Sequence, residues 1–178
     1  MAIPVDLLNR LKAIKLLLLD VDGVLTDGGL TYHDDGVESK LFDVKDGHGI
    51  KLIQRAGVEV GFLTGRYSKA VLNRAHDLGI ELVQQGVRNK EEIYKEILQQ
   101  RKLMDKEVAY MGDDLVDIPV LRRVGLAVAV PDACHDVFPF VHFTTRNPGG
   151  KGACREICEL ILKAQDKWAS VTDRYFPH

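Results

Sequence analysis

The sequence LLLLDVDGVL, residues 16–25, decides the fold of this chain. Four consecutive leucines followed by a turn predict a strand that is buried on both faces of a parallel sheet, where no alternation with polar residues is needed. Asp20 and Asp22 then lie at the carboxyl end of the strand, which is the edge where open parallel sheets bind ligands. Gly23 lets the chain leave the strand in a conformation that side chains disfavour.

Asp20 and Asp22 are the first candidates for a functional site. Two carboxylates one residue apart repel each other unless a cation lies between them or one of them is protonated. A hard metal ion with oxygen ligands is therefore the first expectation. The alternative is structural, because aspartate is also a common turn and capping residue after strands.

Length and composition describe an ordinary globular protein. The 178 residues are enough for a full core, and residues 1–178 are expected to form one domain. The chain is 46% hydrophobic and 28% charged, with a formal net charge of -2. This balance argues against a general nucleic-acid binder, whose surface would be strongly basic.

The three cysteines, Cys134, Cys154 and Cys158, indicate a reducing compartment. Their number is odd and they lack the C-x-x-C spacing of zinc sites and redox pairs, so we expect reduced, half-buried thiols. Cys154 and Cys158 lie one helical turn apart, which leaves a metal-binding pair as a less favoured alternative. The sequence shows neither a signal-peptide pattern nor a membrane-spanning run, so a cytoplasmic location without a membrane partner is expected.

Strands and helices alternate along the rest of the sequence. Extended runs at 30–33 and 37–42 around Asp34-Asp35-Gly36 predict a β-hairpin at about residues 29–43. Alternation of helices and strands predicts an α/β fold with a doubly wound, Rossmann-like parallel sheet. Further strands are expected at 58–63, 80–83, 108–111, 126–130 and 141–143. Helices are expected at 5–12, from Asp46 and Gly47 to Gly57, at 68–78, around 90–98, before Val124 and at 153–168, followed by a loosely held tail at 170–178.

Four polar clusters fall at predicted strand ends or helix starts, and in one sheet they converge at its carboxyl edge. A phosphate ester is a dianion, so a carboxylate can attack its phosphorus only when a divalent cation and a lysine neutralise charge. The pattern therefore predicts phosphoryl transfer. The clusters are Asp20 with Asp22, Thr64, Lys90, and Asp113 with Asp114 and Asp117.

Five residues of this predicted site have expected roles, whereas Asp114 and Asp117 could either contact the ion or position their neighbours through hydrogen bonds. Asp20 and Asp113 would hold Mg²⁺, and Asp20 would attack the phosphorus in line. Thr64 and Lys90 would bind the phosphoryl oxygens, while Asp22 would transfer protons. The structural alternatives are a turn for Thr64, a solvated side chain for Lys90 and helix caps for the aspartates. A lysine at a helix start opposes the helix dipole, which favours a functional reason for Lys90.

Four short motifs resemble the signatures of the haloacid dehalogenase superfamily of phosphohydrolases. They are DVDGV at 20–24, FLTGR at 62–66, the lone Lys90 and GDDLVD at 112–117. More narrowly, LFDVKDGHGI at 41–50, VGLAVAV at 124–130 and NPGGKGACREI at 147–157 resemble the 3-deoxy-manno-octulosonate 8-phosphate phosphatases of lipopolysaccharide precursor synthesis. The resemblance covers almost the whole chain.

The resemblance implies a role for each matching residue. Asp20 would become an aspartyl phosphate, and Asp22 would act as general acid and then base while giving Mg²⁺ its main-chain oxygen. Asp113 would be the third protein ligand of the ion, and Thr64 and Lys90 would bind phosphate. Positions that contact the sugar acid or close over it match Asp43, Lys45, Asp46, Gly47, Lys51, Arg66 and Arg74.

Three of these positions depart from the pattern of the family. This chain has Lys45 and Lys51 where family members carry arginine, and Asp43 where asparagine occurs. Lysine cannot reproduce the two-pronged grip of arginine on a carboxylate. The resemblance implies 3-deoxy-manno-octulosonate 8-phosphate as the substrate, and these departures leave a nine-carbon keto-deoxy sugar acid 9-phosphate as the alternative.

The spacing of the motifs leaves no room for a cap domain, because only the hairpin and one helix separate Asp20 from Thr64. A hairpin of this size is not stable alone, and hairpins from several subunits can bury their apolar residues together. The family is tetrameric in this way. A homotetramer is expected, with Lys151 reaching the site of a neighbouring subunit.

Two other classes of protein are compatible with part of the pattern. A receiver-type phospho-switch also uses an acceptor aspartate, an acidic pair, a threonine and a lysine on a doubly wound sheet. Receivers place the acidic pair before the acceptor, whereas here Asp20 comes first, and Asp22 supplies the proton transfer that releases phosphate. A catalytically idle assembly subunit is disfavoured because the predicted site is complete.

Overall fold

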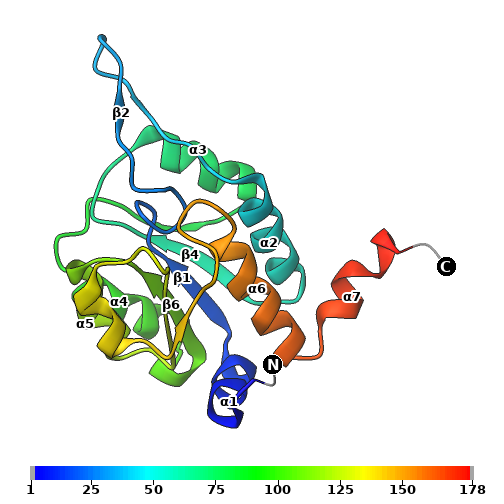
Figure 1. The fold of residues 1–178 in the computed structure, drawn as a ribbon. Helices are drawn as coiled ribbons and strands as arrows, with labels where there is room; N and C mark the ends of the chain where they lie inside the picture. The colour runs from blue at the N-terminus through cyan, green and yellow to red at the C-terminus, as the bar shows by residue number, and fades with distance from the viewer. Residues whose placement is uncertain (1–2, 177–178) are drawn as a thin grey trace.

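The computed structural model describes residues 3–176 and contains one parallel sheet with helices on both faces (Figure 1). Within that range the sheet has six strands in the order β5-β4-β1-β6-β7-β8, and every pairing is parallel. The predicted doubly wound α/β fold is confirmed. The strands are β1 (Leu16–Leu19), β4 (Glu59–Leu63), β5 (Leu82–Gln84), β6 (Val108–Gly112), β7 (Leu126–Ala129) and β8 (Phe143–Thr144).

The four leucines of β1 explain why this strand is central. Each is fully buried, and they alternate between two cores, with Leu17 and Leu19 in one and Leu16 and Leu18 in the other. The first core also includes residues of α1 (Val5–Ala13), α2 (Val44–Arg55), α3 (Lys69–Leu78), α6 (Ala153–Ala164) and α7 (Trp168–Thr172). The second includes residues of α4 (Lys90–Arg101) and α5 (Ile118–Leu121). Four short 3₁₀ helices lie at η1 (Asp105–Glu107), η2 (Leu115–Asp117), η3 (His135–Phe140) and η4 (Asp173–Tyr175).

The register of the sheet brings the predicted motifs to one edge. Leu19 at the end of β1 pairs with Phe62 of β4 on one side and with Met111 of β6 on the other. The next residues along these strands, beginning with Asp20, therefore leave the sheet side by side.

A small hairpin follows β1 and projects from the body of the molecule (Figure 1). Its strands β2 (Thr31–Tyr32) and β3 (Glu38–Ser39) are antiparallel, and Gly36 in the connecting turn has a φ of 80°. The hairpin is confirmed, although its paired strands are shorter than the predicted extended runs. In the described part of the chain no cap domain accompanies it, as expected.

Two predicted helix boundaries are wrong. Helix α2 begins at Val44, with Asp43 as its cap, rather than at Asp46, because the Asp43 side chain accepts a hydrogen bond from Lys45 N. The expected helix at 153–168 ends at Ala164, since Asp166 adopts a left-handed conformation with φ 55°. Aspartate tolerates that conformation, but nothing in the local sequence signals it as glycine would.

The tail at 170–178 is not loosely held over its first residues. Val171 and Thr172 of α7 are buried, and Thr172 donates its hydroxyl to Trp168 O at 2.8 Å. Trp168 in turn has the Lys163 ammonium over its ring. Residues 177–178 lie outside the described residues.

The cysteines differ from expectation in their burial. Cys154 and Cys158 are completely buried in α6 rather than half-buried, and Cys134 is of intermediate exposure. All three are free thiols.

Across residues 3–176 no helix combines the length and apolar character required to cross a lipid bilayer.

Candidate active site

Carboxylates from β1 and β6 meet at the carboxyl edge of the sheet. Oxygens of Asp20, Asp113 and Asp117 lie within 4.8 Å of one another. The backbone N–H of Asp20 donates to Met111 O at 3.0 Å, which ties the two loops together. Gly23 has a φ of 90°, and a Cβ at this position would lie 2.0 Å from Asp113 Oδ2, so only glycine leaves room for that carboxylate. We call Asp20, Lys90, Asp113 and Asp117 the carboxylate–lysine cluster.

The aspartates of this cluster hold more negative charge than their surroundings neutralise. Burial and the neighbouring Asp117 raise the pKa of Asp20 to about 7, although Lys90 opposes the change. Burial, Asp20 and Asp117 raise the pKa of Asp113 to about 8. Asp113 Oδ1 is buried and accepts no hydrogen bond from any described residue. These observations fit a bound divalent cation, whose charge favours the ionised carboxylates.

Asp117 organises the cluster. Its side chain is fully buried, and Oδ1 accepts hydrogen bonds from the Lys90 ammonium at 2.6 Å and from the Tyr110 hydroxyl at 2.5 Å. Oδ2 accepts from the backbone N–H groups of Asp113 at 2.9 Å and Asp114 at 3.1 Å. Because both oxygens are already engaged, Asp117 is better suited to position its neighbours than to ligate a metal. Asp114 is exposed and accepts from Leu115 N.

Lys90 is buried rather than solvated. It is the first residue of α4, where Asn89 provides the cap, and its Nζ lies 3.0 Å from Asp20 Oδ1. Burial works against its charge, but Asp20 and Asp117 together outweigh burial and raise the pKa of Lys90. The lysine is therefore a fixed positive charge directly beside Asp20.

Thr64 leaves β4 next to β1 and is 2% exposed. Its backbone N–H donates to Gln84 O at 2.9 Å, and its hydroxyl accepts from Arg66 N at 3.4 Å. The sheet thus brings Thr64 to the edge that carries Asp20 and Asp113.

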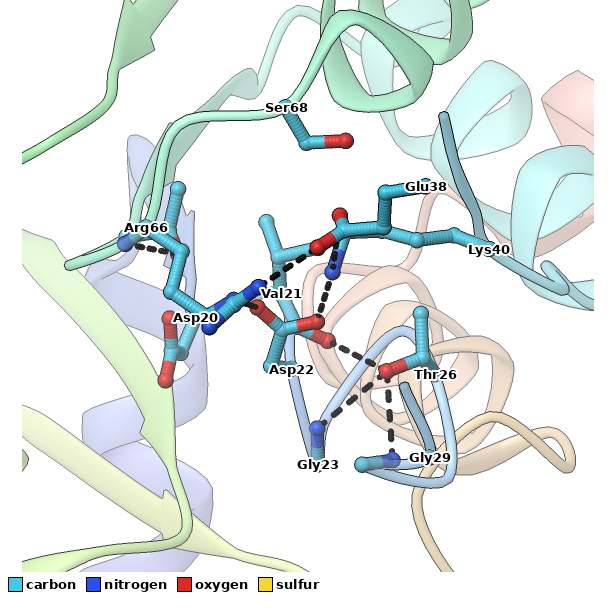
Figure 2. A network of polar contacts seen from close by, with 12 residues as sticks. Asp20, Val21, Asp22, Gly23, Thr26, Gly29, Glu38, Lys40, Arg66 and Ser68 are labelled. Carbon is cyan, nitrogen blue, oxygen red and sulfur yellow. Dashed lines mark hydrogen bonds and ion pairs between the residues drawn. The ribbon is translucent and has the colours of Figure 1, made fainter. Parts of the chain in front are cut away.

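Asp22 is held by the hairpin (Figure 2). The Lys40 ammonium bonds to Asp22 Oδ1 and lies 3.2 Å from Glu38 Oε1. Arg66 Nη2 donates to Glu38 Oε2 at 2.5 Å, and Arg66 Nε lies 3.5 Å from Asp22 Oδ2. Sequence reasoning identified Arg66 but missed Glu38 and Lys40. Glu38 and Lys40 alternate along one strand and so share a face, but this spacing alone does not indicate a contact with Asp22.

Four of the residues predicted to contact the sugar acid, Asp43, Asp46, Gly47 and Arg74, lie where neighbouring helices meet. Arg74 Nη2 donates to Asp43 O at 2.9 Å, and a Cβ on Gly47 would lie 2.3 Å from the same Nη2. Asp46 is buried and accepts hydrogen bonds at the start of α6, from Gly152 N at 3.3 Å and Arg155 N at 2.7 Å. Burial raises the pKa of Asp46. These contacts fix the first turn of α2 against α3 and α6.

The predicted lysines divide between two hollows. Lys45 and Lys151 line a cavity of about 620 Å³ beside α6, together with Arg146 and Arg155. Lys51 lines a different hollow, near Gly79 at the end of α3, and is not brought to the carboxylate–lysine cluster. The loop that carries Lys151 packs on the Asp20 loop, because Gly150 N donates to Val24 O at 2.9 Å.

Comparison with known proteins identifies related chains. Residues 76–157 match the family model of haloacid dehalogenase-like hydrolases. The 3-deoxy-D-manno-octulosonate 8-phosphate phosphatase of Yersinia pestis is 44% identical over 167 residues, which cover 94% of this chain and 89% of that protein. The phosphatase of the same name from Escherichia coli K12 is also 44% identical, over 162 residues, 91% of this chain and 86% of that protein.

Solved structures are similar as well. The 3-deoxy-D-manno-octulosonate 8-phosphate phosphatase of Moraxella catarrhalis, in complex with magnesium ion, phosphate ion and KDO, superposes with a TM-score of 0.93 at 36% identity. The alignment covers 96% of this chain and 98% of that one. The relatives thus span the hairpin, the sheet and the loops that form the site.

Proposed function

This chain belongs to the 3-deoxy-D-manno-octulosonate 8-phosphate phosphatase family of haloacid dehalogenase-like hydrolases, and from this we propose that it is a Mg²⁺-dependent phosphoric monoester hydrolase. Its substrate is 3-deoxy-D-manno-octulosonate 8-phosphate, and its products are the free sugar acid and phosphate. The observation that carries the proposal is the meeting of Asp20, Asp113 and Lys90 at the edge of the sheet.

We propose that Asp20 is the nucleophile. Its carboxylate attacks phosphorus to form an aspartyl phosphate, and Asp22 gives a proton to the departing sugar oxygen. Asp22 then takes a proton from the water that hydrolyses the aspartyl phosphate. Thr64 and the buried ammonium of Lys90 bind the phosphoryl oxygens, since a fixed positive charge in a buried site stabilises the developing charge.

Asp20, Asp113 and the main-chain oxygen of Asp22 are the residues that would hold Mg²⁺, with water completing the coordination. When bound, the ion neutralises phosphoryl charge and so lets a carboxylate approach phosphorus. Asp117 keeps Lys90 and the Asp113 loop in place for this arrangement.

The sugar acid is the less completely specified part of the substrate. We propose that its carboxylate and hydroxyls are bound by residues from Asp43 to Gly47 together with Lys51, Arg66, Arg74 and Lys151. The cavity that Lys45 and Lys151 both line supports this role for them. Lys51 lines a different hollow, so its side chain would have to change direction to contact the sugar acid.

Phosphate release from a panel of sugar acid phosphates tests this function. We expect turnover of the eight-carbon substrate with Mg²⁺, none after chelation, and a loss of about 10³-fold or more for Asp20→Asn. Asp35→Asn at the exposed hairpin tip serves as the control and should retain full activity. Faster turnover of a nine-carbon sugar acid 9-phosphate than of the eight-carbon substrate would assign the enzyme to the nine-carbon compound. A long-lived phosphoprotein without turnover would indicate a receiver-type switch.

We further propose that the chain acts as a homotetramer assembled through the hairpin. The hairpin exposes large apolar side chains, including Tyr32 at 62%, Val37 at 55% and Leu41 at 81%. Burying these side chains against other copies would stabilise a strand pair that is too small to be stable alone. Light scattering that finds an active monomer would contradict this assembly.

The domain organisation and the cellular location follow from the same family membership and composition. We propose that residues 1–178 form one phosphatase domain, with the hairpin at about 29–43 as its insertion. We place the protein in the cytoplasm, and the buried free thiols of Cys154 and Cys158 support a reducing compartment. Cell fractionation that recovers the activity outside the cytoplasm would contradict this location.

A further inference from the structure

The two carboxylate oxygens of Asp22 have different surroundings (Figure 2). Oδ1 accepts a hydrogen bond from the Lys40 ammonium. Oδ2 is buried, and among residues 3–176 no donor makes a hydrogen bond to it, although Arg66 Nε lies 3.5 Å away. One oxygen is therefore fixed in place, while the other is available for a proton or a ligand.

The Lys40 side chain is built into this position. It is 0% exposed, and burying an ammonium is unfavourable unless it is paired. Glu38 supplies the second anion at 3.2 Å and is itself held by Arg66. Burial alone would raise the pKa of Glu38, but its contacts with the positive charges of Arg66 and Lys40 outweigh burial and lower that pKa. The carboxylates of Asp22 and Glu38 thus fix the direction of the Lys40 side chain.

We propose that Lys40 is a positioning residue that holds Asp22 Oδ1 and thereby makes Oδ2 the proton-transferring oxygen. This inference rests on the proposed function. In the first step the bond from Asp20 to phosphorus forms and the bond to the sugar oxygen breaks, while the proton on Asp22 Oδ2 moves to that oxygen. In the second step water attacks phosphorus, its proton goes to Oδ2, and the bond to Asp20 breaks.

The test compares two leaving groups with Lys40→Met. A sugar alkoxide needs a proton to leave, whereas p-nitrophenolate does not, and kcat/KM reports the steps through formation of the aspartyl phosphate. We expect kcat/KM for the sugar acid phosphate to fall about 10- to 100-fold, and that for p-nitrophenyl phosphate to change less than about threefold. Asp22→Asn should show the same selectivity with a larger loss. Equal losses on both substrates would overturn the inference.

Matched variants separate positioning from a general effect on the hairpin. Ser39→Ala removes a hydroxyl that hydrogen-bonds to His33 across the hairpin, and this change should leave both rates unchanged. Adding Lys40→Met to Asp22→Asn should cost no more than about twofold further, because the lysine acts through Asp22. A further tenfold loss in that double variant would contradict the inference.

Separate experiments distinguish a failure of the variant to fold, and a failure of the proposed function, from a failure of this inference. If Lys40→Met does not fold, Glu38→Gln loosens the same lysine and should shift the ratio of the two kcat/KM values in the same direction. An unchanged ratio in folded Glu38→Gln would also count against the inference. Failure of the proposed function would appear instead as a wild-type protein with no metal-dependent phosphatase activity.

Discussion

The carboxylate–lysine cluster and the hairpin differ in how far their side chains are buried within a single chain. In the cluster, Asp117 and Lys90 are buried and their charges are paired with residues of the same chain. In the hairpin, Tyr32, Val37 and Leu41 are largely exposed. On the proposed function, we expect the chemistry at phosphorus to be built within one chain and recognition of the sugar acid to depend on a surface that a second copy covers.

Replacing Asp117 should produce the largest effect in the cluster. Asp117→Asn removes one of the two buried counter-charges of Lys90 and disturbs four hydrogen bonds. We expect a loss of about 3 kcal/mol in the free energy of unfolding, roughly 6 to 12 °C in Tm, together with about 10²-fold in kcat. Thermal melting and phosphate release measure these changes. Asp114→Asn, at an exposed neighbour, is the control, and an equal effect there would contradict the role of Asp117.

Disrupting the hairpin should affect assembly and recognition of the sugar acid. Leu41→Glu places a charge in the proposed interface, so we expect smaller assemblies by light scattering. The kcat/KM for the sugar acid phosphate should fall about tenfold, while that for p-nitrophenyl phosphate stays within about threefold. A variant that remains tetrameric, or one that loses both activities equally, would argue against the division between the two regions.

The pH dependence of metal binding tests the raised pKa values of Asp20 and Asp113 in the cluster. In metal-free protein the raised pKa values of Asp20, about 7, and Asp113, about 8, mean that the folded state binds more protons than the unfolded state above pH 4. The contribution of these groups to stability therefore falls as pH rises toward 8, and Mg²⁺ should restore it. We expect Mg²⁺ to raise Tm by a few degrees more at pH 8 than at pH 5.5. A shift of equal size at both pH values, or one that persists in Asp113→Asn, would contradict this prediction.

The smallest expected effect concerns the sugar acid. Lys45→Arg offers a two-pronged contact to a carboxylate, so KM for the sugar acid phosphate should fall about two- to fivefold with kcat unchanged. Lys51 lines a different hollow, so Lys51→Arg should change KM less than Lys45→Arg does. If Lys51→Arg lowers KM more, Lys51 rather than Lys45 makes the main contact to the carboxylate.

The sequence predicted those parts of the molecule that local patterns determine. Strand ends placed Asp20 and Asp113 at one edge, because parallel strands carry their carboxyl ends together. Lys90 was also predicted, although its burial arises only when Asp117 packs against it. Asp20, Lys90 and Asp113 were predictable because each immediately follows a strand or begins a helix.

The remaining details depend on contacts between distant segments. Lys40 reaches Asp22 across 18 residues through the path of the hairpin, which no local spacing reveals. The break before α7 depends on a left-handed Asp166 that the sequence does not mark. Lys51 matched a family position, yet the helix turns it toward the end of α3. Side-chain direction, rather than the choice of element, is what sequence reasoning did not determine.

Mapping the covalent phosphate tests the central claim most directly. Enzyme mixed with labelled sugar acid phosphate is quenched in acid and digested, and the labelled peptide is identified by mass spectrometry. The account predicts label on Asp20 that requires Mg²⁺ and is absent from Asp113→Asn. Label on another residue, or labelling of Asp20 that persists after chelation, would contradict it.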